Sequence, residues 1–495
     1  MALYTQEQLD AITTSETKAG ILAGAGAGKT HTLAGRVAEL LQRGVEPEKI
    51  AVFTFTNKAA NELKARLEAQ LGCDSSKLTV GTFHAVAYEM HPYNPRVISP
   101  EEEGMIYRKH ANDDAAVRSE KRLKNLASYE DLLVFLGTQI GLDQVDWEHV
   151  VVDEAQDTDE LQWEIIDMLV QRGTNLFAVG DTRQNIYQWR GAKTENFVAR
   201  IDKMLPLSTT FRFSDEGCDL SNALAAKAGD DSPKLLPPPL WKNIPGEVQT
   251  SELDPVDAYL LLQKNGWDPE DVAILCHTNR EVSLIRSGLA AEGVALAMDP
   301  RVIRGSVWME LLRWIACPSE MSDKLVAFLD KNFDLKGEFA YDENPLLSRV
   351  IVQSWIEMDN VRPTVESICQ KLKLKWKGDD KDLELLDLLI EEIGTEGFYE
   401  GVNALSIEGL QLQSQPVGVT VCTVHQSKGL EWPAVIAVDS AFRPKAETLR
   451  TCYVQSTRHT EKLVICGAYG PLHECARELG FKSTSEGVSF GTRNK

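Results

Sequence analysis

The sequence predicts an α/β protein with two parallel sheets. Short apolar runs alternate with stretches of helical periodicity, and strands separated by helix-length segments are typical of parallel sheets. The runs form two groups, four before residue 205 and three after residue 270, so we expect each group to build its own sheet. The expected strands are 20–23, 50–55, 149–152, 176–179, 272–276, 435–438 and 463–466.

Length and composition limit the possible classes of protein. A chain of 495 residues is long enough for two to four folding units, each with a core. The net charge of −22 argues against a surface that attracts nucleic acid everywhere, so a nucleic-acid site must be a local groove. The nine cysteines are scattered without a Cys-x-x-Cys pair, which disfavours a disulfide framework, a zinc site or an iron–sulfur cluster. The N-terminus does not read as a secretion signal and no apolar stretch reaches about 18 residues, so we expect a cytoplasmic protein without a membrane partner.

Two stretches interrupt the strand–helix alternation. Residues 91–145 and 315–410 are charged and helix-leaning, and we interpret both as helical insertions into the sheet domains. The proline-rich stretch 230–239 is expected to be an extended connection. The expected layout is a first sheet domain from 1–90 plus 146–205, a short insertion at 91–145, a second sheet domain from 206–314 plus 411–495, and an insertion at 315–410.

A glycine-rich loop follows the first expected strand and opens a helix. It comprises Ala23, Gly24, Ala25, Gly26, Ala27, Gly28, Lys29 and Thr30. Small residues allow backbone N–H groups to wrap a triphosphate, Lys29 can reach the β and γ phosphates, and Thr30 can ligate magnesium. A tight strand-to-helix turn is the structural alternative, and the strict pattern has glycine where Ala23 stands. The Lys-Thr pair at the helix start favours phosphate binding.

Two adjacent carboxylates end the strand 149–152. Asp153 is suited to hold magnesium and Glu154 to polarise an attacking water. Acidic residues at a helix start are the alternative interpretation. The position of the pair, at the end of an apolar strand downstream of a phosphate loop, favours catalysis.

Aromatic residues follow the next strand. Tyr187 and Trp189 lie two residues apart between Gly180 and Gly191, with Arg190 beside them. Aromatic rings with an arginine can stack on nucleic acid, whereas buried aromatic residues are more often core. The i, i+2 spacing in a loop favours a shared exposed face. Phe53 and Phe83 are expected in the core.

With these residues in place, the chain resembles the UvrD/Rep group of superfamily 1 helicases, in the family's motif order. The resemblance implies two RecA-like domains of the P-loop NTPase type, each with a helical insertion. It implies ATP and Mg²⁺ as cofactors, with Thr30 and Asp153 as metal ligands. Segments 51–60, 81–84 and 129–133 match further motifs of the group.

The resemblance also implies roles for individual residues. It makes Gln8 the reader of adenine, Gln184 a sensor of the γ phosphate, and Phe211 a stacking partner for adenine. It makes Arg212 and Arg458 arginine fingers, whereas an arginine read alone is more often part of a surface ion pair. Glu431 joins the nucleotide contacts, and the implied DNA contacts are Phe55, Asn57, His84, Tyr187, Trp189, Arg190, Thr423 and His425.

The chain departs from the family pattern in two ways. His31 and His277 stand where the family has arginine, and Gln455 and His459 replace small residues beside Arg458. Both expected insertions are about half the length found in long bacterial members, and nothing after residue 470 resembles a nuclease. Duplex unwinding is therefore less firmly implied than ATP hydrolysis.

Three hypotheses follow. The first is a DNA-dependent ATPase that moves 3′ to 5′ on single strands and unwinds tailed duplex DNA in replication, repair or recombination. The second is a DNA-stimulated ATPase subunit of a nuclease or phage-defence complex. The third is an RNA-directed motor, because stacking does not distinguish sugars. A protein partner, such as a nuclease or a replication or repair factor, is compatible with the first two.

Overall fold

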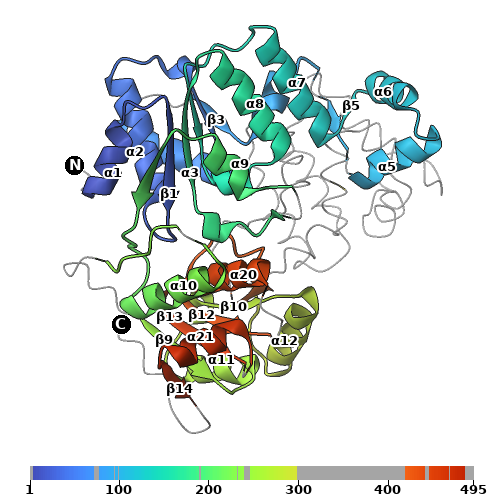
Figure 1. Ribbon diagram of the computed structural model, residues 1–495. Coiled ribbons are helices and arrows are strands. Elements are labelled where there is room, and N and C mark those ends of the chain that lie inside the picture. Colours follow the sequence, from blue (N-terminus) through green and yellow to red (C-terminus); the bar gives the residue numbers. More distant parts are fainter. Residues whose placement is uncertain are drawn as a thin grey trace, which may run out of the picture. The chain divides into compact units, whose positions relative to one another are not determined.

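The computed structural model, shown in Figure 1, describes residues 4–71, 77–93, 95–98, 100–188, 191–230, 232–238, 246–297, 311, 418–440, 445–467 and 469–484. The chain divides into two compact units. The first comprises 1–86, 133–298 and 416–495 and contains both sheets, and the second comprises 87–132 and 299–415. The expected insertion at 315–410 lies outside the described residues.

The first sheet has six strands in the order β3-β2-β6-β7-β1-β8, and all of its strand pairs are parallel. The strands are β1 (Lys18–Ala23), β2 (Ile50–Phe53), β3 (Thr79–Gly81), β6 (His149–Val152), β7 (Asn175–Gly180) and β8 (Lys203–Leu207). The four strands expected here are confirmed. The expected set omitted β3 and β8, and β8 carries this sheet two residues beyond the expected boundary at 205.

Helices cover this sheet on both sides, as the blue α1 and α2 and the green α8 and α9 show in Figure 1. Apolar residues of α2 and α3, such as Leu33 and Leu63, pack on Val52, Val151 and Val179 in one core. The helices here are α1 (Gln6–Thr13), α2 (Lys29–Gln42), α3 (Asn57–Leu71), α4 (Phe83–Met90), α7 (Tyr129–Gly141), α8 (Glu160–Gln171) and α9 (Thr194–Ala199). α1 and α8 begin at capping boxes, which satisfy free N–H groups at their starts.

The second sheet is also entirely parallel, in the order β11-β10-β12-β13-β9-β14. Its strands are β9 (Glu247–Ser251), β10 (Val272–Cys276), β11 (Thr420–Thr423), β12 (Trp432–Val438), β13 (His459–Cys466) and β14 (Lys482–Thr484). The three expected strands are confirmed, and β9, β11 and β14 were not expected. Two parallel sheets with flanking helices confirm the predicted fold class.

Alternate residues of the second sheet face two different helical layers. Leu275, Val435 and Ile465 belong to a core shared with α10, α20 and α21. Ile274 and Ile436 belong to a core shared with α11 and α12. The helices are α10 (Asp215–Lys227), α11 (Pro255–Lys264), α12 (Asn279–Ala291), α20 (Ala446–Ser456) and α21 (Pro471–Glu478). Burial on both faces explains why the strands are continuous apolar runs in the sequence.

The described part of the second unit contains α5 (Pro100–Lys109), α6 (Asp114–Leu123), and the short parallel pair β4 (Arg96–Val97) and β5 (Leu126–Ala127). Lys121 is buried and pairs with Asp131 at 2.8 Å and with Glu103. The helical character expected for 91–145 is therefore present.

None of the described helices combines the length and apolar character required to cross a membrane.

Candidate nucleotide and nucleic-acid sites

The glycine-rich loop connects β1 to α2. Ala23 ends β1, and Lys29 and Thr30 form the first turn of α2. Gly26 and Gly28 have φ values of 74° and 81°, a region that glycine adopts without steric cost. A Cβ at Gly26 would lie 2.5 Å from the Cβ of Arg212, so a larger residue would collide with the segment that leads into the second sheet domain.

The carboxylate pair lies where β6 ends beside this loop. Asp153 is buried, and Glu154 adopts a φ of 50°, which is uncommon for a residue other than glycine. Lys29 Nζ donates to Glu154 Oε2 at 3.3 Å, and Gln156 Nε2 donates to the same oxygen at 2.6 Å. The expected phosphate-loop lysine and the expected catalytic carboxylate are thus in contact.

The two carboxyl groups have opposite pKa shifts. Burial, and then the charge of Glu154, raises the pKa of Asp153 to about 7. Burial opposes ionisation of Glu154 as well, but the charges of Lys29 and Lys428 outweigh it and lower its pKa to about 2. Glu154 is therefore an anion at neutral pH, whereas Asp153 is only partly ionised there.

Arg458 reaches this site from the second sheet domain. It follows α20, is 2% exposed, and donates from Nη2 to Gln184 Oε1 at 3.0 Å. Burial, and then the like charge of Arg212, lowers the pKa of Arg458 to about 9. Its guanidinium is thus held in a buried position without full compensation by an anion. The structure brings together the expected γ-phosphate sensor and one expected arginine finger.

The other expected arginine finger, Arg212, binds partners within the second sheet domain. Its Nη2 pairs with Glu431 Oε2 at 2.8 Å, and its Nη1 donates to the carbonyl of Thr457 at 3.0 Å, one residue before Arg458. The neighbouring Phe211 donates its backbone N–H to the carbonyl of Gly26 at 2.9 Å. This segment therefore contacts both the glycine-rich loop and the end of α20.

Gln8 lies against the opposite part of the loop. Its side chain closes the capping box of α1 with Thr5, and its Nε2 donates to the carbonyl of Ala27 at 3.3 Å. A Cβ at Gly28 would lie 2.7 Å from the same nitrogen. The residue expected to read adenine is therefore beside the loop expected to hold the phosphates.

Asp181 joins several of these groups. This buried carboxylate accepts from Arg183 Nε at 2.9 Å, from Gln184 Nε2 at 2.8 Å and from the Tyr453 hydroxyl at 3.2 Å. The Tyr453 oxygen in turn accepts from the backbone N–H of Ala25 at 3.4 Å. Burial opposes the ionisation of Asp181, yet the charges of Arg183 and Lys29 hold its pKa below the usual value. One residue of α20 thus connects the glycine-rich loop with the carboxyl end of β7.

Lys428 connects the nucleotide site with aromatic residues. Its Nζ pairs with buried Asp157 and donates to the carbonyl of Gln184 at 3.0 Å. The same nitrogen lies 4.9 Å from the ring centroid of Tyr187 and 5.8 Å from that of Phe55, which is within cation–π range. Burial raises the pKa of Asp157 to about 6, although Lys428 opposes this rise.

The expected stacking residues Phe55 and Tyr187 contact each other. Their centroids lie 5.3 Å apart with planes 26° apart, and the Tyr187 hydroxyl donates to the carbonyl of His425 at 3.3 Å. A base between two rings needs about twice the base rise of ~3.4 Å. The rings are closer than that, so a base could stack only on an outward ring face in this arrangement. Phe53 and Phe83 stack on each other in the core, as expected.

The remaining expected DNA contacts lie at strand ends. Asn57 begins α3 after β2, His84 lies in α4 after β3, and Thr423 ends β11, where its hydroxyl donates to Gln426 Oε1 at 3.0 Å. Burial lowers the pKa of His84 to about 4, so this imidazole is neutral at pH 7. Trp189 and Arg190 lie outside the described residues.

Four residues of these sites were not among the expected ones: Asp157, Asp181, Lys428 and Tyr453. Each lies within five positions of an expected site residue, namely Glu154, Gln184, His425 and Arg458 respectively, so the only signal in the sequence was this proximity. Their partners could not be read from the sequence, because Lys428 and Asp157 are 271 residues apart and Tyr453 and Asp181 are 272 apart.

The residues present fit a nucleotide with magnesium. Gly26 and Gly28 have positive φ, which allows the tight turn that a phosphate loop needs, and Lys29 is at the start of a helix, where anions are favoured. Arg458 is a buried cation lacking full compensation, as an arginine awaiting phosphate oxygens would be. Thr30 and Asp153 supply the hydroxyl and carboxylate oxygens that Mg²⁺ prefers.

The class of protein follows from this arrangement: two RecA-like sheet domains sharing one phosphate loop are the architecture of a P-loop nucleotide hydrolase. The comparisons with known proteins then give the family. The UvrD/REP helicase N-terminal domain matches residues 4–139 and 101–204, and the UvrD-like helicase C-terminal domain matches residues 418–466. The chain belongs to the UvrD/Rep-like family of superfamily 1 helicases.

Relatives cover nearly all of the chain. It is 24% identical to the "ATP-dependent DNA helicase PcrA" of Leuconostoc citreum, over 94% of this chain and 82% of the relative. The proteins of the same name from Staphylococcus epidermidis and Staphylococcus aureus are 25% and 24% identical, each over 93% of this chain and 83% of the relative. The first alignment spans 625 positions, more than the 495 residues of this chain, so the relative has segments that this chain lacks.

Proposed function

We propose that the chain is an ATP-dependent DNA translocase that moves 3′ to 5′ on single strands and unwinds tailed duplex. The observation that carries the proposal is the contact between Gln184, from the first sheet domain, and Arg458, from the second. A site divided between two domains can convert a change at the nucleotide into relative movement of the domains. Family membership and the printed names of the relatives support DNA as the track.

The chemical roles follow from the contacts at the loop. Lys29 binds the β and γ phosphates, and Glu154, anionic and beside Lys29, polarises the attacking water. Thr30 and Asp153 would hold Mg²⁺, which supplies charge stabilisation to the phosphate oxygens. Arg458 and Arg212 neutralise charge on the transferred phosphoryl group. Gln8 and Phe211 hold the adenine from opposite parts of the loop.

The coupling route passes through Gln184 and Lys428. Arg458 binds the Gln184 side chain and Lys428 binds its carbonyl, so a shift of Gln184 toward a γ phosphate alters contacts with both residues. Lys428 also lies over the rings of Tyr187 and Phe55. We infer that nucleotide binding and release change the spacing of these two rings.

DNA binding is assigned to the aromatic residues and the strand ends around them. Phe55 and Tyr187 supply stacking faces, with Trp189, Arg190, Asn57, His84, Thr423 and His425 as further contacts. Stacking contributes about 1–3 kcal/mol per base and does not depend on base identity. Movement along the strand can therefore be independent of sequence.

The decisive test is Glu154→Gln. We expect the variant to bind ATP and single-stranded DNA as the parent does and to lose nearly all DNA-stimulated ATP hydrolysis, because the amide cannot polarise water. The matched control is Glu164→Gln on the exposed side of α8, which should hydrolyse ATP at the parental rate. A Glu154→Gln variant with parental hydrolysis would refute the proposal.

Substrate choice and polarity are tested with the same preparation. Strand displacement is measured on 3′-tailed, 5′-tailed and blunt duplexes, and the proposal requires activity on the 3′-tailed substrate alone. DNA-stimulated hydrolysis without displacement would instead support the nuclease or phage-defence subunit. Stronger stimulation by RNA than by a matched DNA oligomer would support the RNA-directed motor.

A further inference from the structure

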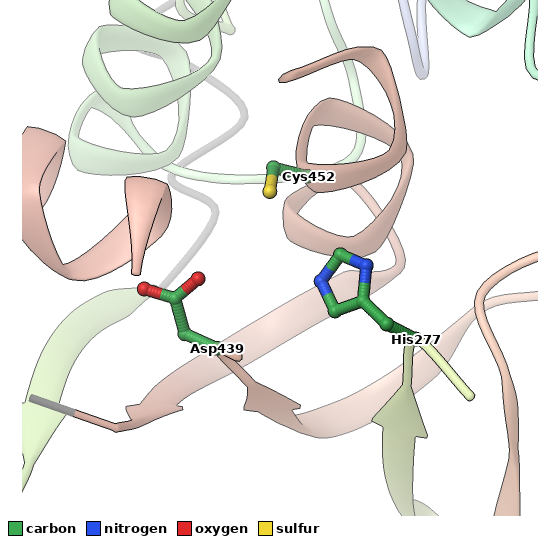
Figure 2. A group of neighbouring side chains, drawn as sticks. All are labelled: His277, Asp439 and Cys452. Atoms are coloured by element: carbon green, nitrogen blue, oxygen red, sulfur yellow. The ribbon is translucent and has the colours of Figure 1, made fainter. Parts of the chain in front are cut away.

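Three metal-binding side chains from distant parts of the sequence meet in the second sheet domain. His277 follows β10, Asp439 follows β12, and Cys452 lies on α20. One potential ligand atom from each residue lies within 4.8 Å of the other two. Figure 2 shows the carboxylate of Asp439, the thiol of Cys452 and the imidazole of His277 on three sides of a common space.

The donor set has the chemistry of a zinc site. Imidazole nitrogen, thiolate sulfur and carboxylate oxygen are the three ligand types that Zn²⁺ takes in proteins. A neutral imidazole, a thiolate and a carboxylate together carry two negative charges, so a divalent ion would leave the buried centre neutral. The thiolate favours zinc over magnesium or calcium, which prefer oxygen ligands. Three protein ligands leave a fourth position for water.

The carboxylate of Asp439 caps α21, where the backbone N–H groups of Leu472 and His473 both face it. The residue is 5% exposed, and its Oδ2 accepts from the backbone N–H of His473 at 2.7 Å in the first turn of α21. Among the described residues, Oδ1 is buried and has no hydrogen-bond partner. A Cβ at Gly470 would overlap the carboxylate of Asp439, so the lack of a side chain at Gly470 leaves space for that carboxylate. An oxygen buried in this way is costly unless a cation or a donor meets it.

The surroundings of His277 also suit a metal ligand. Gln455 donates from its Nε2 to the carbonyls of Leu275 at 2.8 Å and Val438 at 3.2 Å, which fixes the amide between β10 and β12. The same side chain lies beside the imidazole of His277. Partners of this kind set the orientation and tautomer of a ligating imidazole. His277 is half-buried as a residue, and its Nε2 is buried.

We propose that His277, Asp439 and Cys452 form a zinc site that holds α20 against the carboxyl ends of β10 and β12. α20 carries Tyr453, which contacts Ala25 and Asp181, and it is followed by Arg458. An ion at its centre would therefore fix the helix that reaches the glycine-rich loop. The scattered cysteines predicted no zinc site, because a cluster assembled from three elements leaves no spacing pattern in the sequence.

The test uses the tag-free full chain, stripped with a chelator and titrated with Co²⁺ as a spectroscopic probe and then with Zn²⁺ in competition. We expect one equivalent of Co²⁺ with a thiolate charge-transfer band, displacement of the band by Zn²⁺, and a rise in melting temperature with Zn²⁺. Cys452→Ser should abolish the band. Asp439→Asn should weaken Co²⁺ binding at least tenfold, while its amide oxygen can still cap α21.

The matched control is Cys466→Ser, which changes an equally buried cysteine of the same sheet outside the cluster. This variant should keep the band and the stoichiometry. Absence of a thiolate band in the parent, a band that persists in Cys452→Ser, or equal loss in Cys466→Ser would each overturn the proposal. Should Cys452→Ser fail to fold, unchanged Co²⁺ affinity in Asp439→Asn would overturn it as well. None of these readouts depends on ATP hydrolysis, so the proposed function can fail independently.

Discussion

Replacing Lys428 by methionine tests whether the buried ion pair with Asp157 holds the two sheet domains together. The side chains are 7% and 0% exposed, so removal of the lysine leaves a carboxylate without its counter-ion in a site closed to water. Breaking a buried pair in this way costs about 3–5 kcal/mol. Because the entropy of unfolding grows with chain length, a chain of 495 residues loses about 1 °C per kcal/mol, and the melting temperature should fall by about 3–5 °C. DNA-stimulated ATP hydrolysis should fall further than hydrolysis without DNA, because Lys428 also lies over Phe55 and Tyr187.

The assay compares thermal unfolding and ATP hydrolysis, with and without single-stranded DNA. Lys462→Met is the matched control, because Lys462 is also buried and paired, at 2.8 Å from Glu247, but within the second sheet alone. It should lower the melting temperature and leave the stimulation by DNA unchanged. Parental melting and parental stimulation in Lys428→Met would refute the reasoning.

The pH dependence gives an independent check of the same pair. The pKa of Asp157 in the folded chain is about 6, above the ~3.9 of an unfolded aspartate, so this group lowers stability progressively as the pH rises from about 4 to 6 and by a constant amount above pH 6. The charge of Lys428 lowers the pKa of Asp157, so removal of Lys428 should raise this pKa further. The loss of stability that Lys428→Met causes relative to the parent should therefore be larger at pH 8 than at pH 5.5. Adding Asp157→Asn to Lys428→Met should reduce this loss. A loss that does not change between these pH values would contradict this account.

Further predictions concern the nucleotide and DNA contacts. Tyr453→Phe removes a hydroxyl that bonds both Ala25 and Asp181, and a loss of about 1 kcal/mol should raise KM for ATP about fivefold, whereas an unchanged KM would argue against this contact. Arg458→Lys should reduce DNA-stimulated kcat by about 10³–10⁵, and a reduction of less than tenfold would exclude a finger role. Phe55→Ala should weaken single-stranded DNA binding by about 1–3 kcal/mol in fluorescence anisotropy while leaving DNA-independent hydrolysis intact, and equal affinity would exclude stacking on Phe55.

The sequence predicted seven of the eight inner strands of the two sheets, because these seven are buried on two faces and read as continuous apolar runs. The strands that escaped prediction are short, exposed or polar. β3 and β14 have three residues each, β8 has a single buried residue and a proline, and the inner strand β9 reads Glu-Val-Gln-Thr-Ser. Short or half-exposed strands depend on a neighbouring strand for their existence, and that neighbour is distant in sequence. β8, for example, forms beside β1.

Motif spacing by itself determined where the phosphate loop and the carboxylate pair lie, because Lys29, Asp153 and Glu154 follow strands whose carboxyl ends meet in a parallel sheet. Only the tertiary structure decided the partners: Arg458 on Gln184, Tyr453 on Asp181, Lys428 on Asp157, and the meeting of His277, Asp439 and Cys452. Local patterns reflect hydrogen bonds and burial within one element. Contacts between residues more than 100 positions apart arise when separate elements pack together, and no short-range pattern records them.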